Sequence, residues 1–169
     1  MIEEVRVRPL ATPSLLLGIG LGGFFDGILL HQILQWHNML SSVTPPVDLV
    51  TMKYNMLWDG LVHAVTWVVT LVGVVMLFRA ARRDDVVWSG RIFGGTMVFG
   101  WGLFNFVEGI LDHLILGVHH VHPGAHQLAW DIGFVGVAGI GLMLAGFLIS
   151  RSEVHGDRMS PATRRALAM

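Results

Sequence analysis

The chain has 169 residues, of which 53% are hydrophobic and only 14% are charged, whereas about a quarter of a typical soluble domain is charged. It contains no cysteine, and this excludes disulfides, thiolate zinc sites, iron–sulfur clusters and cysteine nucleophiles. The formal net charge of -1 conceals an uneven distribution of positive residues. These features indicate a single-domain, polytopic membrane protein.

In chain order, four apolar runs each exceed the roughly 20 residues that a membrane-spanning helix needs. None shows the continuous charged face of a soluble amphipathic helix. The first run is too long for a cleaved signal peptide, so we expect it to be retained. The prediction is an all-α, four-helix transmembrane bundle over residues 1–150, followed by a flexible cytoplasmic tail over 151–169. The predicted helices are about 13–40, 54–78, 92–118 and 128–150.

Positive charges favour one side of the predicted bundle. Lys53 alone lies on the other side. By the positive-inside rule, both termini are expected in the cytoplasm, and the connections after the first and third helices outside. The basic loops are explained by topology, so no nucleic-acid partner is expected. The ten arginines on the positive side are Arg6, Arg8, Arg79, Arg82, Arg83, Arg91, Arg151, Arg158, Arg164 and Arg165.

The first and third predicted helices repeat one another at an offset of 82 residues. Eleven of the twenty positions from 18 to 37 are identical in the two copies, and Asp26 corresponds to Glu108. The second and fourth helices share only Trp58-Asp59 and Trp130-Asp131. We interpret this as a duplicated two-helix hairpin, whose copies are related by an axis along the membrane normal.

Ionisable residues concentrate at the outer ends of the repeated helices. Such groups are costly in lipid and usually face one another, a metal or water. From helix rise, His31, His63 and His113 are expected about 13 Å deep, with Asp112 beside them, as one metal site. A shallower layer of candidates is expected nearer the interface, so the two layers suggest one or two metal sites. The candidate ligands of the shallower layer are His37, Asp59, His119, His120, His126 and Asp131.

Asp26 and Glu108 are predicted to lie deepest in the membrane of all the ionisable residues. Glu108 is a further candidate ligand, and both carboxylates are candidates for orienting imidazoles or for a proton path. Asp26 and His37 lie eleven residues apart, about 16 Å along a helix axis. They cannot share one metal unless the helix breaks.

Imidazole with carboxylate suits transition metals, with copper or iron favoured and zinc as a further option. The leading hypothesis is a membrane metalloprotein acting in redox chemistry or metal handling, as an oxidoreductase or beside another membrane redox complex. One alternative is a b-type haem protein with His31 and His113 as axial ligands. Another is an ion transporter or channel, which would need homo-oligomerisation. A purely structural subunit would not explain so many polar groups in lipid.

Two stretches carry a family resemblance. Residues 23–37 (GFFDGILLHQILQWH) and 105–121 (NFVEGILDHLILGVHHV), together with Asp59-Gly60-x-x-His63, resemble a bacterial family of small four-span membrane proteins catalogued as a domain of unknown function. The resemblance implies a bacterial inner-membrane protein and supplies no activity. The D-x-x-x-H pairing of Asp59 and His63 also looks like part of the intramembrane copper site of particulate methane monooxygenase.

Overall fold

The computed structural model describes residues 8–86 and 88–151. They form four helical rods, three of which contain π-helical segments. The tail predicted to be flexible lies, from residue 152 onward, outside the described residues. The first rod is α1 (Arg8–Asp26) with η1 (Gly27–Ile33), and the second is α2 (Leu49–Ala81). The third is α3 (Gly90–Glu108) with η2 (Gly109–Ile115), and the fourth is α4 (Gln127–Gly133), η3 (Phe134–Gly141) and α5 (Leu142–Arg151).

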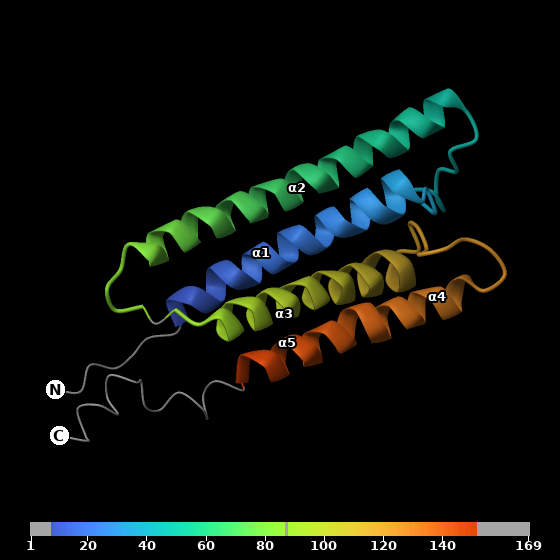
Figure 1. Ribbon diagram of the computed structural model, residues 1–169. Coiled ribbons are helices and arrows are strands. Elements are labelled where there is room, and N and C mark those ends of the chain that lie inside the picture. The colour runs from blue at the N-terminus through green and yellow to red at the C-terminus, as the bar shows by residue number, and fades with distance from the viewer. Residues whose placement is uncertain (1–7, 87, 152–169) are drawn as a thin grey trace, which may run out of the picture.

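The rods lie side by side in the order α2, α1, α3, α4–α5, as Figure 1 shows. Within the described residues, α2 makes no contact with the fourth rod. The four rods therefore form an open row, in which the two outer rods do not meet. The most apolar window of the first rod is 56% buried, against 11% for those of α2 and the fourth rod. The two outer rods expose large hydrophobic side chains on several faces, which suits contact with lipid rather than with a second protein layer.

Glycines bring α1 and α3 into close contact. A Cβ added at Gly18 would meet the backbone carbonyl of Met97, and one added at Gly100 would meet the backbone carbonyl of Leu15. The two contacts are related by the 82-residue offset. Small residues at a helix crossing let the backbones approach where packing, not hydrophobic burial, drives association. These glycines therefore mediate the packing of the two central rods.

Three helices are long and apolar enough to cross a membrane: Pro9–Ile33, Leu49–Ala81 and Gln127–Arg151. The third rod is not among them. It carries Asn105, Glu108, Asp112 and His113, and it is packed between α1 and the fourth rod, so it does not need an apolar surface on every side. A fourth span remains a prediction.

The first and third rods end earlier than predicted, at Ile33 and Ile115 instead of near residues 40 and 118. Each ends in a π-helical segment, a wider turn that often occurs at functional sites. Two residues later the backbone takes a positive φ, 51° at Gln35 and 58° at Gly117. This left-handed step turns each chain out of its helix and back across the end of the rod.

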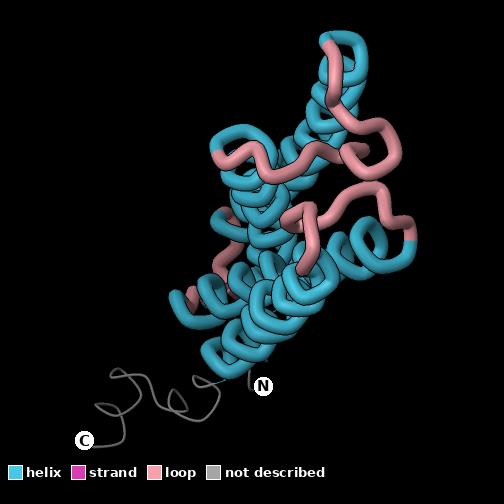
Figure 2. The backbone as a smooth tube through the Cα atoms, turned by 90° about the vertical axis from the view of Figure 1, so that its right-hand side faces the viewer, coloured by secondary structure: helices cyan, strands magenta, loops and turns pink. Residues whose placement is uncertain are grey.

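The connections 34–48 and 116–126 lie at the same end of the molecule. Figure 2 shows both lying across the helix ends, near one another. A backbone hydrogen bond of 3.0 Å, from the Ser42 N–H to the Val118 carbonyl, links them. The two connections therefore form a common cover over the ends of the central rods, where the ionisable residues lie.

Candidate metal centre

Four imidazoles meet beneath this cover. His31 and His113 come from η1 and η2, and His37 and His119 come from the returning connections. The ring centroids of His37 and His119 lie 4.7 Å apart in a stacked arrangement. Those of His31 and His37 are 4.5 Å apart, and those of His113 and His119 are 4.6 Å apart. All four side chains are buried. We call these four residues the histidine quartet.

In each half of the molecule a carboxylate from the neighbouring rod faces the Nδ1 of the deeper histidine, as a hydrogen bond for His31 and as a longer contact without a hydrogen bond for His113. The Nδ1 of His31 lies 3.0 Å from Asp59 Oδ1. In the other half, the Nδ1 of His113 lies 3.5 Å from Asp131 Oδ1. A carboxylate that holds the outer nitrogen of an imidazole is a common way to orient a metal-binding histidine.

The same two carboxylates hold the connections in place. Asp59 accepts hydrogen bonds from the Met39 N–H at 2.7 Å and from the Asn38 side chain at 2.7 Å. Asp131 accepts from the Val121 N–H at 2.9 Å and lies 2.6 Å from the Nδ1 of His120. Asp59 and Asp131 therefore position both the quartet and its cover.

The inner nitrogens of the deeper histidines face a second pair of carboxylates. The Nε2 of His31 lies 3.3 Å from Asp26 Oδ2, and the Nε2 of His113 lies 2.8 Å from Glu108 Oε1. Neither nitrogen is aligned to donate a hydrogen bond, and both are buried without a hydrogen-bond partner. Glu108 Oε2 is likewise buried and unpartnered.

The outer histidines are fixed by backbone carbonyls. The Nδ1 of His37 lies 2.8 Å from the carbonyl oxygen of Val121, and the Nδ1 of His119 lies 3.1 Å from that of Met39. A carbonyl only accepts, so both nitrogens must carry the hydrogen. Burial and the neighbouring His31 and His119 rings lower the pKa of His37 to about 3. His37 is therefore neutral at physiological pH, with an unpartnered lone pair on its buried Nε2.

Two overlapping sets of ligand atoms can hold a cation. One is His31, His37 and His119, and the other is Glu108, His113 and His119, each with its atoms within 4.8 Å of one another. The two predicted layers are thus merged into one centre. The helix rise that placed His37 far from His31 does not apply, because the chain leaves the helix at Ile33 and folds back.

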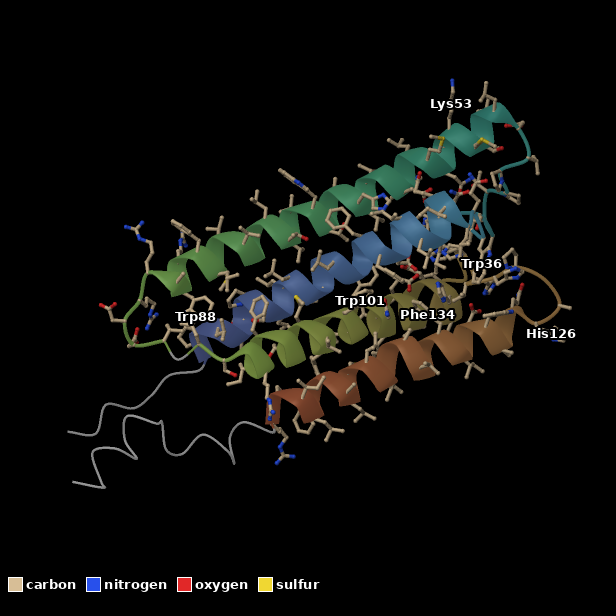
Figure 3. The ribbon with its side chains drawn as sticks, viewed as in Figure 1. Trp36, Lys53, Trp88, Trp101, His126 and Phe134 are labelled. Atoms are coloured by element: carbon tan, nitrogen blue, oxygen red, sulfur yellow. The ribbon has the colours of Figure 1, made fainter. Side chains whose placement is uncertain are left out.

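The other predicted ligands lie outside the quartet. Asp59, Asp131 and Asp26 surround it as hydrogen-bonding or facing carboxylates, and His120 contacts Asp131. His63 and Asp112 instead line a cavity between α1, α2 and α3. His126 is exposed and lies on the outer loop, away from the polar groups that gather between the central rods in Figure 3.

Sequence reasoning missed the parts played by Asn38, Met39 and Val121. Asn38 and Met39 correspond to His120 and Val121 at the same 82-residue offset, and that correspondence is the signal that could have identified them. The backbone groups of Met39 and Val121 serve twice: the N–H binds a carboxylate, and the carbonyl accepts from a histidine of the opposite half.

The fold and the site define an all-helical membrane protein with a buried histidine and carboxylate cluster beneath two crossing connections. The chain belongs to the family described as "Predicted membrane protein (DUF2243)", whose pattern it matches over residues 13–153. No curated protein and no solved structure matches it.

Proposed function

We propose that this chain is an integral membrane metalloprotein whose histidine quartet, with Glu108 and Asp26, binds one or two transition-metal ions. Copper or iron is favoured and zinc is a further option, since imidazole suits all three and carboxylate favours the harder ions. The centre would serve redox chemistry or metal handling for another membrane complex. Its fixed outer nitrogens and free inner nitrogens resemble the orienting shell around known metal sites.

The contact between His119 and Glu108 carries this proposal. Because the Nδ1 of His119 donates to the Met39 carbonyl, a neutral ring has no hydrogen on Nε2. That nitrogen nevertheless lies 2.9 Å from Glu108 Oε1, so two acceptors face one another unless a proton or a cation lies between them. A metal ion bound by both groups would resolve the conflict.

Charge balance supports a cation over a single shared proton. Asp26, Asp59, Glu108 and Asp131 are all buried around the quartet, and the described residues place no lysine or arginine within ion-pair distance of any of them. Among the described residues, only histidine rings lie within ion-pair distance of these carboxylates, and a buried carboxylate needs a positive partner. One or two divalent ions would neutralise much of the carboxylates' negative charge.

The haem alternative fits this geometry poorly. A porphyrin between His31 and His113 would need space beside Gly27 and Gly109, but a Cβ at Gly27 would already collide with His63, and one at Gly109 would collide with Val135. The rings of His37 and His119 also pack against those of His31 and His113. Metal ions bound directly by the side chains need no such space.

We further infer a four-span topology built by duplication of a two-helix hairpin. Equal helix lengths, equal π-helical segments and positive φ angles at matched positions support the duplication. The arginine distribution favours termini in the cytoplasm and the metal centre on the outer side. With the family resemblance, this gives a bacterial inner-membrane protein.

The deciding experiment is elemental analysis of detergent-purified protein, with an absorption spectrum of the same sample. We expect copper, iron or zinc at one or two ions per chain without a Soret band. The double variant H37A/H119A should lose the metal, while the control variant H126A, at an exposed loop position, should keep it. Retention of full metal by the double variant would contradict the proposal, and a Soret band with iron would favour haem.

A further inference from the structure

A cavity of about 390 Å³ lies between α1, α2 and α3, next to the metal centre. It extends along the first rod from the level of Ile19 to that of His31, about 18 Å at the rise of an α-helix. Apolar side chains form most of its wall, and its polar groups come from the end nearest the quartet. Its size lies in the usual range for small-molecule sites, which are mostly apolar with a few placed polar groups.

The opposite half of the molecule contains a related cavity of about 560 Å³, lined between α1, α4 and η3. Leu30 lines it at the position that corresponds to Asp112, and Phe25 lines it at the position that corresponds to Val107. Since both halves contribute equally to the quartet, the metal centre does not require this difference. The polar character of the first cavity therefore calls for a separate explanation.

His63 adds to the asymmetry. At an offset of 72 residues, which relates Asp59 to Asp131, the counterpart of His63 is Val135. The Nε2 of His63 is buried without a hydrogen-bond partner. It lies over Gly27, where any larger residue would displace it. An unpaired buried polar atom costs free energy, so its retention in an apolar wall suggests a ligand that pairs with it.

We propose that this cavity binds a lipid-soluble molecule with a hydroxylated head, of the quinol class. Outside the proposed metal ligands, the polar groups that line it include the carboxylate of Asp112, which accepts hydrogen bonds. A hydroxyl group on the ligand would donate to this carboxylate, and the apolar wall formed by Ile19, Leu103 and Phe104 would take the ligand's hydrocarbon part.

The cavity adjoins the metal centre, and His31 and Glu108 line it as well, but two of its polar residues can be changed separately. Asp112 and His63 belong to neither set of clustered ligand atoms, so their replacement can change binding in the cavity while the quartet is left intact. The chain itself supplies the replacements: D112L and H63V give the cavity the residues found at the corresponding positions of the apolar one. V107F narrows the cavity with the side chain found at the related position, and Val107 is 45% exposed.

The test is a titration of the detergent-purified protein with 2-heptyl-4-hydroxyquinoline N-oxide, a fluorescent quinol analogue whose emission falls when it is bound. We expect saturable binding at one site per chain. D112L and V107F should each weaken the affinity for the probe by about tenfold or more. D112L removes a charge-assisted hydrogen bond, and V107F takes up volume in the site. The control V137L changes a wall residue of the apolar cavity and should bind the probe like the unaltered protein.

Metal content measured on the same samples separates the two proposals. If probe binding depends on Asp112 and Val107, it supports a quinol site in the cavity, whether or not the protein contains metal. Absence of saturable binding, or equal binding by the unaltered protein, D112L and V107F, overturns the cavity proposal, even if the quartet holds metal. H63V gives an independent check, because it removes a hydrogen-bonding group without adding bulk.

Discussion

His37 donates a hydrogen bond from Nδ1 to the carbonyl oxygen of Val121, 2.8 Å away in the opposite half of the molecule. The reciprocal bond joins His119 to Met39 at 3.1 Å. Each half therefore orients a histidine of the other. Asp59 and Asp131 bind the N–H groups of the same two backbone residues, so the centre is complete only when the two halves are docked.

Glu108 is expected to be the most sensitive carboxylate. Its Oε1 lies within 2.9 Å of the Nε2 atoms of both His113 and His119. E108Q removes the negative charge at nearly constant shape, so metal affinity should fall by at least about tenfold, by loss of a charged ligand or neighbour. The measurement is a competition titration with a chromogenic chelator. The control D112N changes a nearby acid of the same rod that is outside the ligand sets and should keep its metal; equal loss in both variants would count against a specific role of Glu108.

Asp59 is expected to affect both stability and metal binding. In D59N an amide replaces a carboxylate that accepts from Met39, Asn38 and His31. At least one N–H donor then loses its partner, at a cost of about 1–3 kcal/mol, and metal affinity should drop about 10- to 100-fold through loss of the orienting group. Thermal unfolding and chelator competition on the same preparation measure the two effects. Unchanged metal affinity in D59N would show that Asp59 does not orient His31.

Much of this arrangement is readable from the sequence. The apolar runs predict four helices, and the repeat at an offset of 82 residues predicts that the polar groups arrive in related pairs. All four members of the quartet are among the residues singled out as ligand candidates, although their binding of metal is still a prediction. Local pattern suffices here because helix length, glycine spacing and intramembrane charge are properties of short segments.

The sequence could not predict that histidines from the deeper and the shallower predicted layers meet in one cluster. The distance between His31 and His37 depends on a helix that ends at Ile33 and on a positive φ at Gln35, and glutamine gives no signal for either. The row of rods also escaped prediction, because apolar outer faces are equally compatible with a closed bundle. Both features follow from tertiary contacts that local preference does not encode.

The turns at residues 35 and 117 provide a test of the backbone. Both have positive φ, a conformation that costs a non-glycine residue about 1–2 kcal/mol relative to glycine. Q35G should therefore stabilise the protein, and G117Q should destabilise it by a similar amount, since a Cβ at Gly117 meets nothing within 4 Å and only the backbone term changes. Thermal unfolding of both variants in detergent measures the difference. Opposite signs of the two changes are expected, and equal destabilisation would show that the turns do not share this conformation.

The crossing of α1 and α3 is expected to depend on Gly18 and Gly100. G18A or G100A places a methyl group against a backbone carbonyl of the facing helix, Met97 or Leu15, which cannot move aside as a flexible side chain can. The helices must then separate, with loss of packing that lipid cannot replace, and the quartet that joins the two rods should loosen. We expect a lower unfolding temperature and weaker metal binding together. G94A is the matched control, because a Cβ there meets nothing within 4 Å and alanine favours the helix. If G100A were as stable as G94A and bound metal equally well, α1 and α3 would not cross at these glycines, and the row of helices that positions the metal centre would have to be revised.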